Sequence, residues 1–261
     1  MHDTPHNTRH AHIALAADGV ATLTISDAKS LNILGTPVIR ELTDALKRLA
    51  IHPDVRVVVL RGSGDKAFVG GADIHEMAQL TPPTAEAFIS GLAGLCEAAR
   101  SMPMPTIARL PGWCLGGGLE LAMACDLRIA SSDAHFGMPE VAVGIPSVIH
   151  AALMPRLIGG ARAAWMVLTG ESIDAKTALD WGLVNEVVAP ERLDDAVAGT
   201  AGKLAAMGPA ALRSQKRLLR WWDEMSVEQA VEASVAEFGR AFETDEPRRY
   251  MAPFTNRKRA G

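Results

Sequence analysis

Three short apolar runs constrain this chain more than any other feature. They lie at Val55–Leu60, Thr106–Leu110 and Leu127–Ala130, and the first is β-branched or aliphatic at every position except Arg56. Runs without polar alternation are typical of strands covered on both faces, as in parallel sheets. A glycine-rich turn and a helix from about Gly117 to Cys125 separate the second run from the third. This order of strand, turn and helix predicts an α/β layered fold with largely parallel strands.

The two ends of the chain carry different patterns. Residues from His12 to Ile25 alternate apolar and polar side chains around Asp18-Gly19, which predicts an opening β-hairpin. Thr36-Pro37 then supplies an N-cap and a first-turn proline for an amphipathic helix. After Ala161 the pattern is mainly helical, with a short strand at 183–188 and helices at 161–168, 175–181, 191–206, 209–222 and 227–242.

The late helices are rich in apolar residues, including Trp221 and Trp222. We interpret this excess of apolar surface as an oligomer interface. The alternative is that these helices cover the sheet of their own chain.

Composition excludes several classes of partner. With 261 residues, 48% of them apolar and 21% charged, the chain is typical of a soluble globular protein, and a net charge of −4 predicts no binding to nucleic acid or membranes. Residues 1–11 are polar and His-rich, which predicts a flexible arm and no secretory signal. Cys96, Cys114 and Cys125 are odd in number and form no CxxC pair, so we expect neither disulfides nor structural zinc and place the protein in the cytoplasm.

The glycines Gly116–Gly118 are the strongest indication of a binding site. Three glycines before a helix allow a ligand to approach the backbone, and the first-turn amides of that helix lack intrahelical acceptors. Such amides can donate to an anionic oxygen. Glu120 falls in the same first turn, where a carboxylate could serve in catalysis or only favour the helix dipole.

Two further segments carry related signals. Residues 66–74 form a second glycine-rich turn after a buried strand, which could supply another backbone donor or be a simple loop. Glu140 follows Pro139, where it could be a second functional acid or a routine first-turn acid.

Taken together, these segments resemble those of the enoyl-CoA hydratase/isomerase (crotonase) family. Lys66–Met77 reads KAFVGGADIHEM, Gly112–Arg128 resembles the G-x-x-x-GGG-x-E-L-A-x-x-C-D motif, and Phe136–Gly144 resembles F-G-x-P-E-x-x-x-G. The likeness extends from Ser30 to Phe254. It implies a crotonase-type fold of repeated ββα units in a core at residues 12–200. It also implies a C-terminal helical region at 201–261 that forms a homotrimer or a homohexamer.

The resemblance also implies a site and a reaction. The amides of Ala72 and Gly117 would form an oxyanion hole, Glu120 would activate water, and Glu140 would supply the α-proton. The reaction would be the reversible syn-hydration of a 2-trans-enoyl-CoA to a 3-hydroxyacyl-CoA, in fatty acid metabolism, without metal or other cofactor, since CoA is part of the substrate. Contacts to CoA would come from Lys29, Leu31, Ala72, Asp73, Ile74, Gly117, Phe254 and Arg257.

Other reactions remain open at this stage. Family members with both acids also include carnitinyl-CoA dehydratases and thioester hydrolases, whereas isomerases generally use one acid, and a non-catalytic scaffold is the alternative from another class. Gly62-Ser63-Gly64 formally starts a dinucleotide fingerprint, but a helix would then have to include Gly70-Gly71. Serine hydrolase and zinc peptidase motifs are incomplete.

The chain departs from the common hydratase pattern in two places. Where common hydratases read P-G-x-G-G-T-Q-R, the segment Pro146–Arg156 reads PSVIHAALMPR, which leaves the acyl group open. His150 in this segment could contact substrate, but we interpret it as a surface or hydrogen-bonded core histidine. His75 stands where many relatives carry a lysine near the CoA phosphates.

Overall fold

The computed structural model describes residues 7–255. Its larger sheet has the strand order β1-β2-β3-β5-β7-β10, in which only the β1–β2 pair is antiparallel. This confirms the opening hairpin and the parallel strands expected from the apolar runs. The strands are β1 (Ala11–Leu15), β2 (Val20–Ile25), β3 (Val57–Gly62), β5 (Thr106–Leu110), β7 (Leu127–Ser131) and β10 (Glu186–Val188).

A second sheet has the order β4-β6-β8-β9, and its first three strands are parallel. Each of its strands has three residues: β4 (Ala67–Val69), β6 (Trp113–Leu115), β8 (His135–Gly137) and β9 (Ser172–Asp174). The glycine turn therefore does not lead directly from β5 into a helix, because β6 intervenes. Three residues are too few to show an alternating pattern in the sequence.

The two sheets arise from one repeated unit. Strands β3, β5 and β7 lie side by side in the larger sheet, and each continues into β4, β6 or β8, which lie side by side in the smaller one. Helical segments follow each short strand: α2 (Ile74–Met77) and α3 (Pro82–Arg100), α4 (Gly117–Ala124), and the 3₁₀-helix η1 (Pro139–Val143). The ββα repeat implied by the family resemblance is confirmed.

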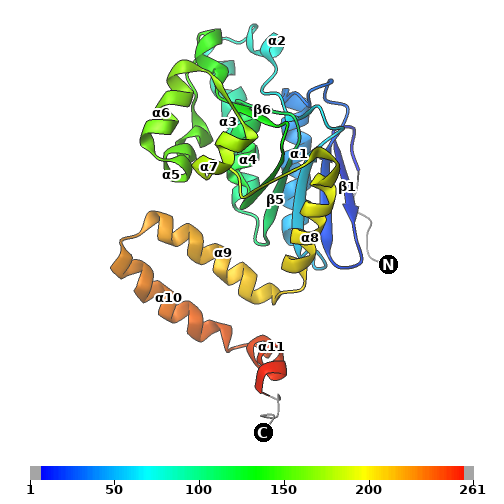
Figure 1. The fold of residues 1–261 in the computed structure, drawn as a ribbon, viewed down its shortest axis with the longest axis vertical. Coiled ribbons are helices and arrows are strands. Elements are labelled where there is room, and N and C mark those ends of the chain that lie inside the picture. Colours follow the sequence, from blue (N-terminus) through cyan, green and yellow to red (C-terminus); the bar gives the residue numbers. More distant parts are fainter. Residues whose placement is uncertain (1–6, 256–261) are drawn as a thin grey trace.

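Alternate residues of the central strands enter two separate cores. Val57 and Val59 of β3 pack with α8 (Leu193–Ala205), while Val58 and Leu60 point to the main core, which includes α1 (Thr36–Ile51) and α3. Figure 1 shows α8 and α1 close to the larger sheet. The residue that precedes α1 as its N-cap is Gly35 and not Thr36. No helix was expected where α3 lies.

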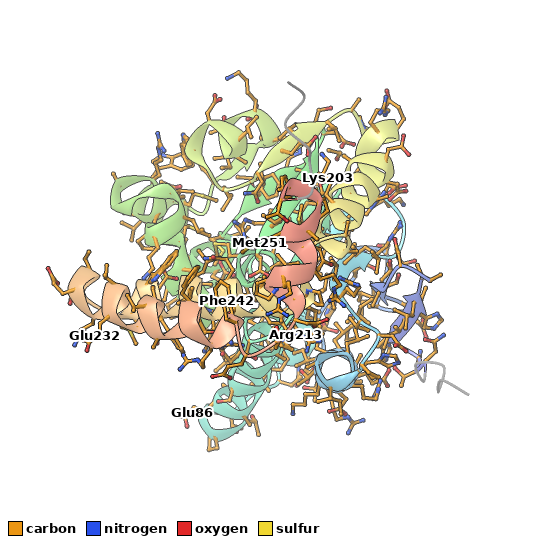
Figure 2. The ribbon with its side chains drawn as sticks, turned by 90° about the horizontal axis from the view of Figure 1, so that it is seen from below. Glu86, Lys203, Arg213, Glu232, Phe242 and Met251 are labelled. Carbon is orange, nitrogen blue, oxygen red and sulfur yellow. The ribbon has the colours of Figure 1, made fainter. Side chains whose placement is uncertain are left out.

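Three helices extend below the core in Figure 1: α9 (Pro209–Glu224), α10 (Val227–Ala241) and α11 (Glu246–Thr255). Ion pairs join α9 to the core, with Lys216 Nζ 2.6 Å from Asp126 Oδ2 and an Arg220 nitrogen 2.6 Å from Glu97 Oε1. Figure 2 looks onto this underside, where Glu232 of α10 lies at the periphery and Phe242 nearer the middle. Residue 200, the expected end of the core, lies within α8, so the helical extension begins after that helix.

The described part of the expected arm is not free. His10 is buried, its amide donates to Glu41 Oε2 over 2.7 Å, and Ala11 already belongs to β1. No helix between residues 7 and 255 is long and apolar enough to cross a membrane. The remaining helical elements are η2 (Ile149–Leu153), α5 (Met154–Ile158), α6 (Gly160–Thr169), α7 (Ala175–Trp181) and η3 (Pro190–Arg192).

Candidate active site

The candidate site lies where three neighbouring strands end. Because β4, β6 and β8 are parallel neighbours, their carboxyl ends lie at one edge of the smaller sheet. Ala72 follows β4, Gly117 follows β6 and Glu140 follows β8. The repeated unit therefore brings together residues that are far apart in the sequence, which is common for sites at the carboxyl ends of parallel strands.

The amide of Ala72 takes no part in the hydrogen bonds that join its segment to Leu34. Ala72 forms a parallel bridge with Leu34, but its two hydrogen bonds run from the Leu34 amide to Gly71 O (2.9 Å) and from the Asp73 amide to Leu34 O (3.0 Å). The N–H of Ala72 therefore points away from Leu34. Gly71 precedes it with φ +121°, a conformation that favours glycine.

Gly117 supplies the second amide. It is the first residue of α4, so its N–H has no acceptor within the helix. The next residue, Gly118, packs so tightly on β4 that a Cβ there would lie 2.5 Å from Val69 O. A Cβ on Gly71 would lie 3.6 Å from Leu115 O, so the two glycine turns are adjacent. The positions predicted for the oxyanion donors thus lie on neighbouring turns of the site.

Glu120 is buried in the first turns of α4, with only 3% of its surface exposed. Its Oε1 accepts a hydrogen bond from the Ala151 amide over 2.8 Å. Burial raises the pKa of Glu120 from 4.5 to about 8; the Ala151 hydrogen bond opposes this rise and the charge of Glu140 adds to it. Glu120 therefore holds its proton at neutral pH.

Glu140 faces the glycine turn from η1. A Cβ on Gly116 would lie 2.5 Å from Glu140 Oε1, and Gly116 itself has φ +52°. The other carboxylate oxygen, Oε2, accepts a hydrogen bond from Ser147 Oγ over 2.9 Å. The structure therefore places Glu140 beside Gly117 and within electrostatic reach of Glu120.

Two contacts to the acids were missed from the sequence. Ser147 and Ala151 both lie in the segment that departs from the common hydratase pattern, and each holds one of the two acids. One contact is made by a backbone amide, which leaves no signal in residue types. The contact of the Ser147 side chain with Glu140 could have been predicted only if the position of Glu140 in the fold were already known.

Several residues expected to contact CoA surround the Ala72 turn. Lys29 Nζ lies 2.6 Å from Asp73 Oδ2, and this ion pair holds the pKa of Asp73 below its usual range. Asp73 also caps α2 by accepting from the amides of His75 and Glu76, while the side chain of Ile74 is exposed. Leu31 accepts the Gly70 amide through its carbonyl over 2.7 Å.

Phe254, another expected CoA contact, is not brought into this group. Phe254 is exposed on α11, which lies at the opposite end of the molecule from α2 (Figure 1). Arg257 lies outside the described residues. Within one chain, therefore, the C-terminal segment as described, which ends at Thr255, does not reach the site.

His150 does not point freely into solvent. Its side chain is 14% exposed, and its Nε2 lies 3.6 Å from Glu97 Oε2. Of the two interpretations, a surface or a hydrogen-bonded core histidine, the low exposure is nearer to the second.

The arrangement combines two functions in one place. Two backbone amides at adjacent turns can stabilise negative charge on a carbonyl oxygen. Two carboxyl groups beside them, one protonated, can exchange protons with a reacting molecule or a water. Proton transfer next to a stabilised oxyanion is the chemistry that this geometry allows.

Comparisons with known proteins agree with this geometry. Residues 16–260 match the family model described as enoyl-CoA hydratase/isomerase. The chain is 36% identical to crotonyl-CoA hydratase of Syntrophomonas wolfei over 242 residues, which are 92% of this chain and 93% of the relative. It is 34% identical to short-chain-enoyl-CoA hydratase of Clostridium acetobutylicum over 252 residues, 95% and 96% of the two chains.

Solved structures show the same likeness. The enoyl-CoA hydratase of Bacillus anthracis superposes with a TM-score of 0.91 at 29% identity, covering 95% of this chain and 97% of that one. Together with the family match over nearly the whole sequence, this shows that the chain belongs to the enoyl-CoA hydratase/isomerase family.

Proposed function

We propose that this protein catalyses the reversible syn-hydration of a 2-trans-enoyl-CoA to a 3-hydroxyacyl-CoA. The observation that carries the proposal is the convergence of the Ala72 and Gly117 turns with the carboxyl groups of Glu120 and Glu140. The named activities of the relatives in S. wolfei and C. acetobutylicum support the same reaction.

The two amides would act on the thioester oxygen. Attack of water at the β-carbon moves charge onto that oxygen as an enolate forms. Two preorganised donors would stabilise this charge by on the order of 3 kcal/mol each. Because the donors belong to the backbone, the side chains at positions 72 and 117 need only leave room for substrate.

The two acids would share the proton transfers. Hydration needs one carboxylate to accept a proton from water and one carboxylic acid to protonate the α-carbon. The proton that the pair shares is on Glu120 at neutral pH, because burial raises the pKa of Glu120 to about 8. For Glu120 to activate water, as the family resemblance implies, this proton has to pass to Glu140 when substrate and water bind. The pair therefore titrates as one unit.

The test is turnover of crotonyl-CoA, a short enoyl thioester chosen because of the two relatives' names. Loss of the conjugated chromophore should be fast with the wild type and at least about 100-fold slower with Glu120→Gln or with Glu140→Gln. Glu186→Gln, an exposed carboxylate on the edge strand β10, is the matched control and should leave turnover unchanged.

Other outcomes identify the alternatives. Near-normal turnover by one of the two site variants favours an isomerase. Release of free CoA favours a hydrolase, and no reaction with any enoyl-CoA despite binding favours a scaffold. Selective turnover of a carnitinyl thioester favours a dehydratase.

We further propose that the C-terminal helices assemble the protein into a trimer or a dimer of trimers. Apolar side chains are exposed along all three helices, and α9–α11 line an apolar groove of about 920 Å³. Exposed apolar surface of this kind is typical of interaction sites. Assembly would also allow Phe254 of one chain to contact CoA bound to another. Sedimentation analysis of the purified protein tests the assembly.

A role in fatty acid metabolism and a location in the cytoplasm belong to the same proposal. The location is supported by Cys96, Cys114 and Cys125, which are buried free thiols.

A further inference from the structure

The segment that departs from the common pattern contains an unusual backbone conformation. Ile149, at the start of η2, has φ +41°. This left-handed region is disfavoured for a β-branched residue, whose side chain crowds its own backbone. Such a conformation persists only where neighbouring contacts hold it in place, and it is common at functional sites.

The next two residues connect this strained position to Glu120. His150 turns its imidazole towards α3, where its Nε2 lies 3.6 Å from Glu97 Oε2. Ala151 follows directly, and its amide donates to Glu120 Oε1 over 2.8 Å. A movement of His150 would therefore also move the amide that holds the buried acid.

Glu97 is itself held by two arginines. An Arg220 nitrogen of α9 lies 2.6 Å from Glu97 Oε1, and an Arg100 nitrogen lies 3.7 Å from Glu97 Oε2. The imidazole thus contacts a carboxylate that is fixed between α3 and the C-terminal helix α9. Its other nitrogen, Nδ1, is enclosed without a hydrogen-bond partner, which suits the neutral tautomer with its proton on Nε2.

We infer that His150 is a positioning residue that, anchored to Glu97, holds the left-handed turn at Ile149 so that the Ala151 amide stays on Glu120. The inference rests on the proposed function, because it assigns Glu120 to the reaction. It also assigns a structural role to the segment Pro146–Arg156, which differs from the common hydratase pattern.

The charges around His150 agree with a neutral imidazole. The groups facing it are Glu97 and Arg100 from α3 and Arg220 from α9, with Glu120 of α4 beyond Ala151. Burial lowers the pKa of His150, Glu97 opposes this, and the two arginines add to it. His150 therefore acts through position and not through its own charge.

The experiment compares His150→Leu, which removes the polar contact, with His150→Gln, which keeps an N–H donor. For His150→Leu we expect kcat for crotonyl-CoA to fall roughly 10- to 100-fold, as for a misplaced catalytic group. KM should change by less than about threefold, since substrate contacts are intact. His150→Gln should recover most of kcat. His12→Leu, an exposed histidine on β1, is the matched control and should behave as the wild type.

The pH profile separates positioning from a general loss of structure. The Ala151 hydrogen bond lowers the pKa of Glu120, and His150→Leu should remove this bond. The part of the curve of kcat against pH that follows the titration of Glu120 should therefore move to higher pH by about one unit. If His150→Leu left both kcat and the pH dependence of kcat unchanged, the inference would be overturned. So would a lower melting temperature with both kinetic properties intact.

Failure of the proposed function would give a different result. If the wild type does not hydrate enoyl-CoA, the pH dependence of unfolding still reports the pKa of Glu120. Above about pH 7.5 the histidine is neutral in both the folded and the unfolded chain, because its folded pKa is lowered from an ordinary value of about 6.5. In that range His150→Leu should alter the dependence in the wild-type background and leave it unchanged in the Glu120→Gln background. Equal effects in both backgrounds would overturn the positioning role.

Discussion

Replacing Glu120 by glutamine should stabilise the protein by an amount that grows with pH. The side chain is 3% exposed, and burial raises its pKa from 4.5 to about 8. Between these two values the unfolded chain releases the proton while the folded protein keeps it. The favourable contribution of protonated Glu120 is therefore complete below about pH 4.5 and is lost as the pH rises towards 8. Glutamine stays neutral throughout, and its side-chain oxygen can still accept the Ala151 amide.

The size of the effect follows from the difference between the two pKa values. At about pH 7 the wild type has lost about 3 kcal/mol relative to its fully protonated form, and at about pH 5 it has lost about 1 kcal/mol. The advantage of Glu120→Gln over the wild type should therefore widen by about 2 kcal/mol between these pH values.

The assay is thermal or urea unfolding of both proteins at equal concentration, so that any assembly affects them alike. A widening of about 2 kcal/mol corresponds to roughly 4 to 8 °C in melting temperature for a chain of this size. Glu186→Gln, with its carboxylate exposed, should show no such widening. An advantage for Glu120→Gln that stays constant between the two pH values would refute the buried, protonated acid.

Three further substitutions test other parts of the site. Gly116→Ala places a Cβ 2.5 Å from Glu140 Oε1, on a residue whose φ is +52°. We expect a loss of stability of about 1 to 2 kcal/mol and a lower kcat. Unaltered unfolding and turnover would contradict this. Ser147→Ala should lower kcat about tenfold, because a hydrogen bond to a carboxylate contributes about 1.5 to 3 kcal/mol, whereas Ser147→Thr should retain activity. Equal rates for the alanine variant and the wild type would exclude a role for this hydroxyl. Phe254→Ala should raise KM for crotonyl-CoA about fivefold by removing about 1 kcal/mol of aromatic contact, with the melting temperature unchanged. An unaltered KM would mean that α11 takes no part in a neighbour's site.

Much of the larger sheet was predictable because its signal is local. Thr106–Leu110 forms β5 with the expected limits, and the hairpin around Asp18-Gly19 forms β1 and β2. Apolar runs without polar alternation reflect burial on both faces, and Val57 and Val58 do enter opposite cores. The helix α3 was missed although Phe88, Leu92, Leu95 and Ala99 have helical spacing and Thr81 supplies a capping box, so this signal was present.

The smaller sheet could not be predicted in the same way. Its strands have three residues each, and they pair with strands more than 20 residues away. Nothing local favours such short segments as strands, because their hydrogen bonds exist only after the repeated units stack. The adjacency of the Ala72 and Gly117 turns depends on that stacking.

The sequence by itself determined which residues are the candidates for the proposed chemistry: glycine turns that expose amides, and acids placed directly after them. These properties depend on residue type and on position within a local element. The tertiary structure alone decided the state of those groups. Burial keeps the proton on Glu120, and the segment Ser147–Ala151 holds both acids. Desolvation and contacts between distant segments arise only when the chain is folded, so no local pattern records them.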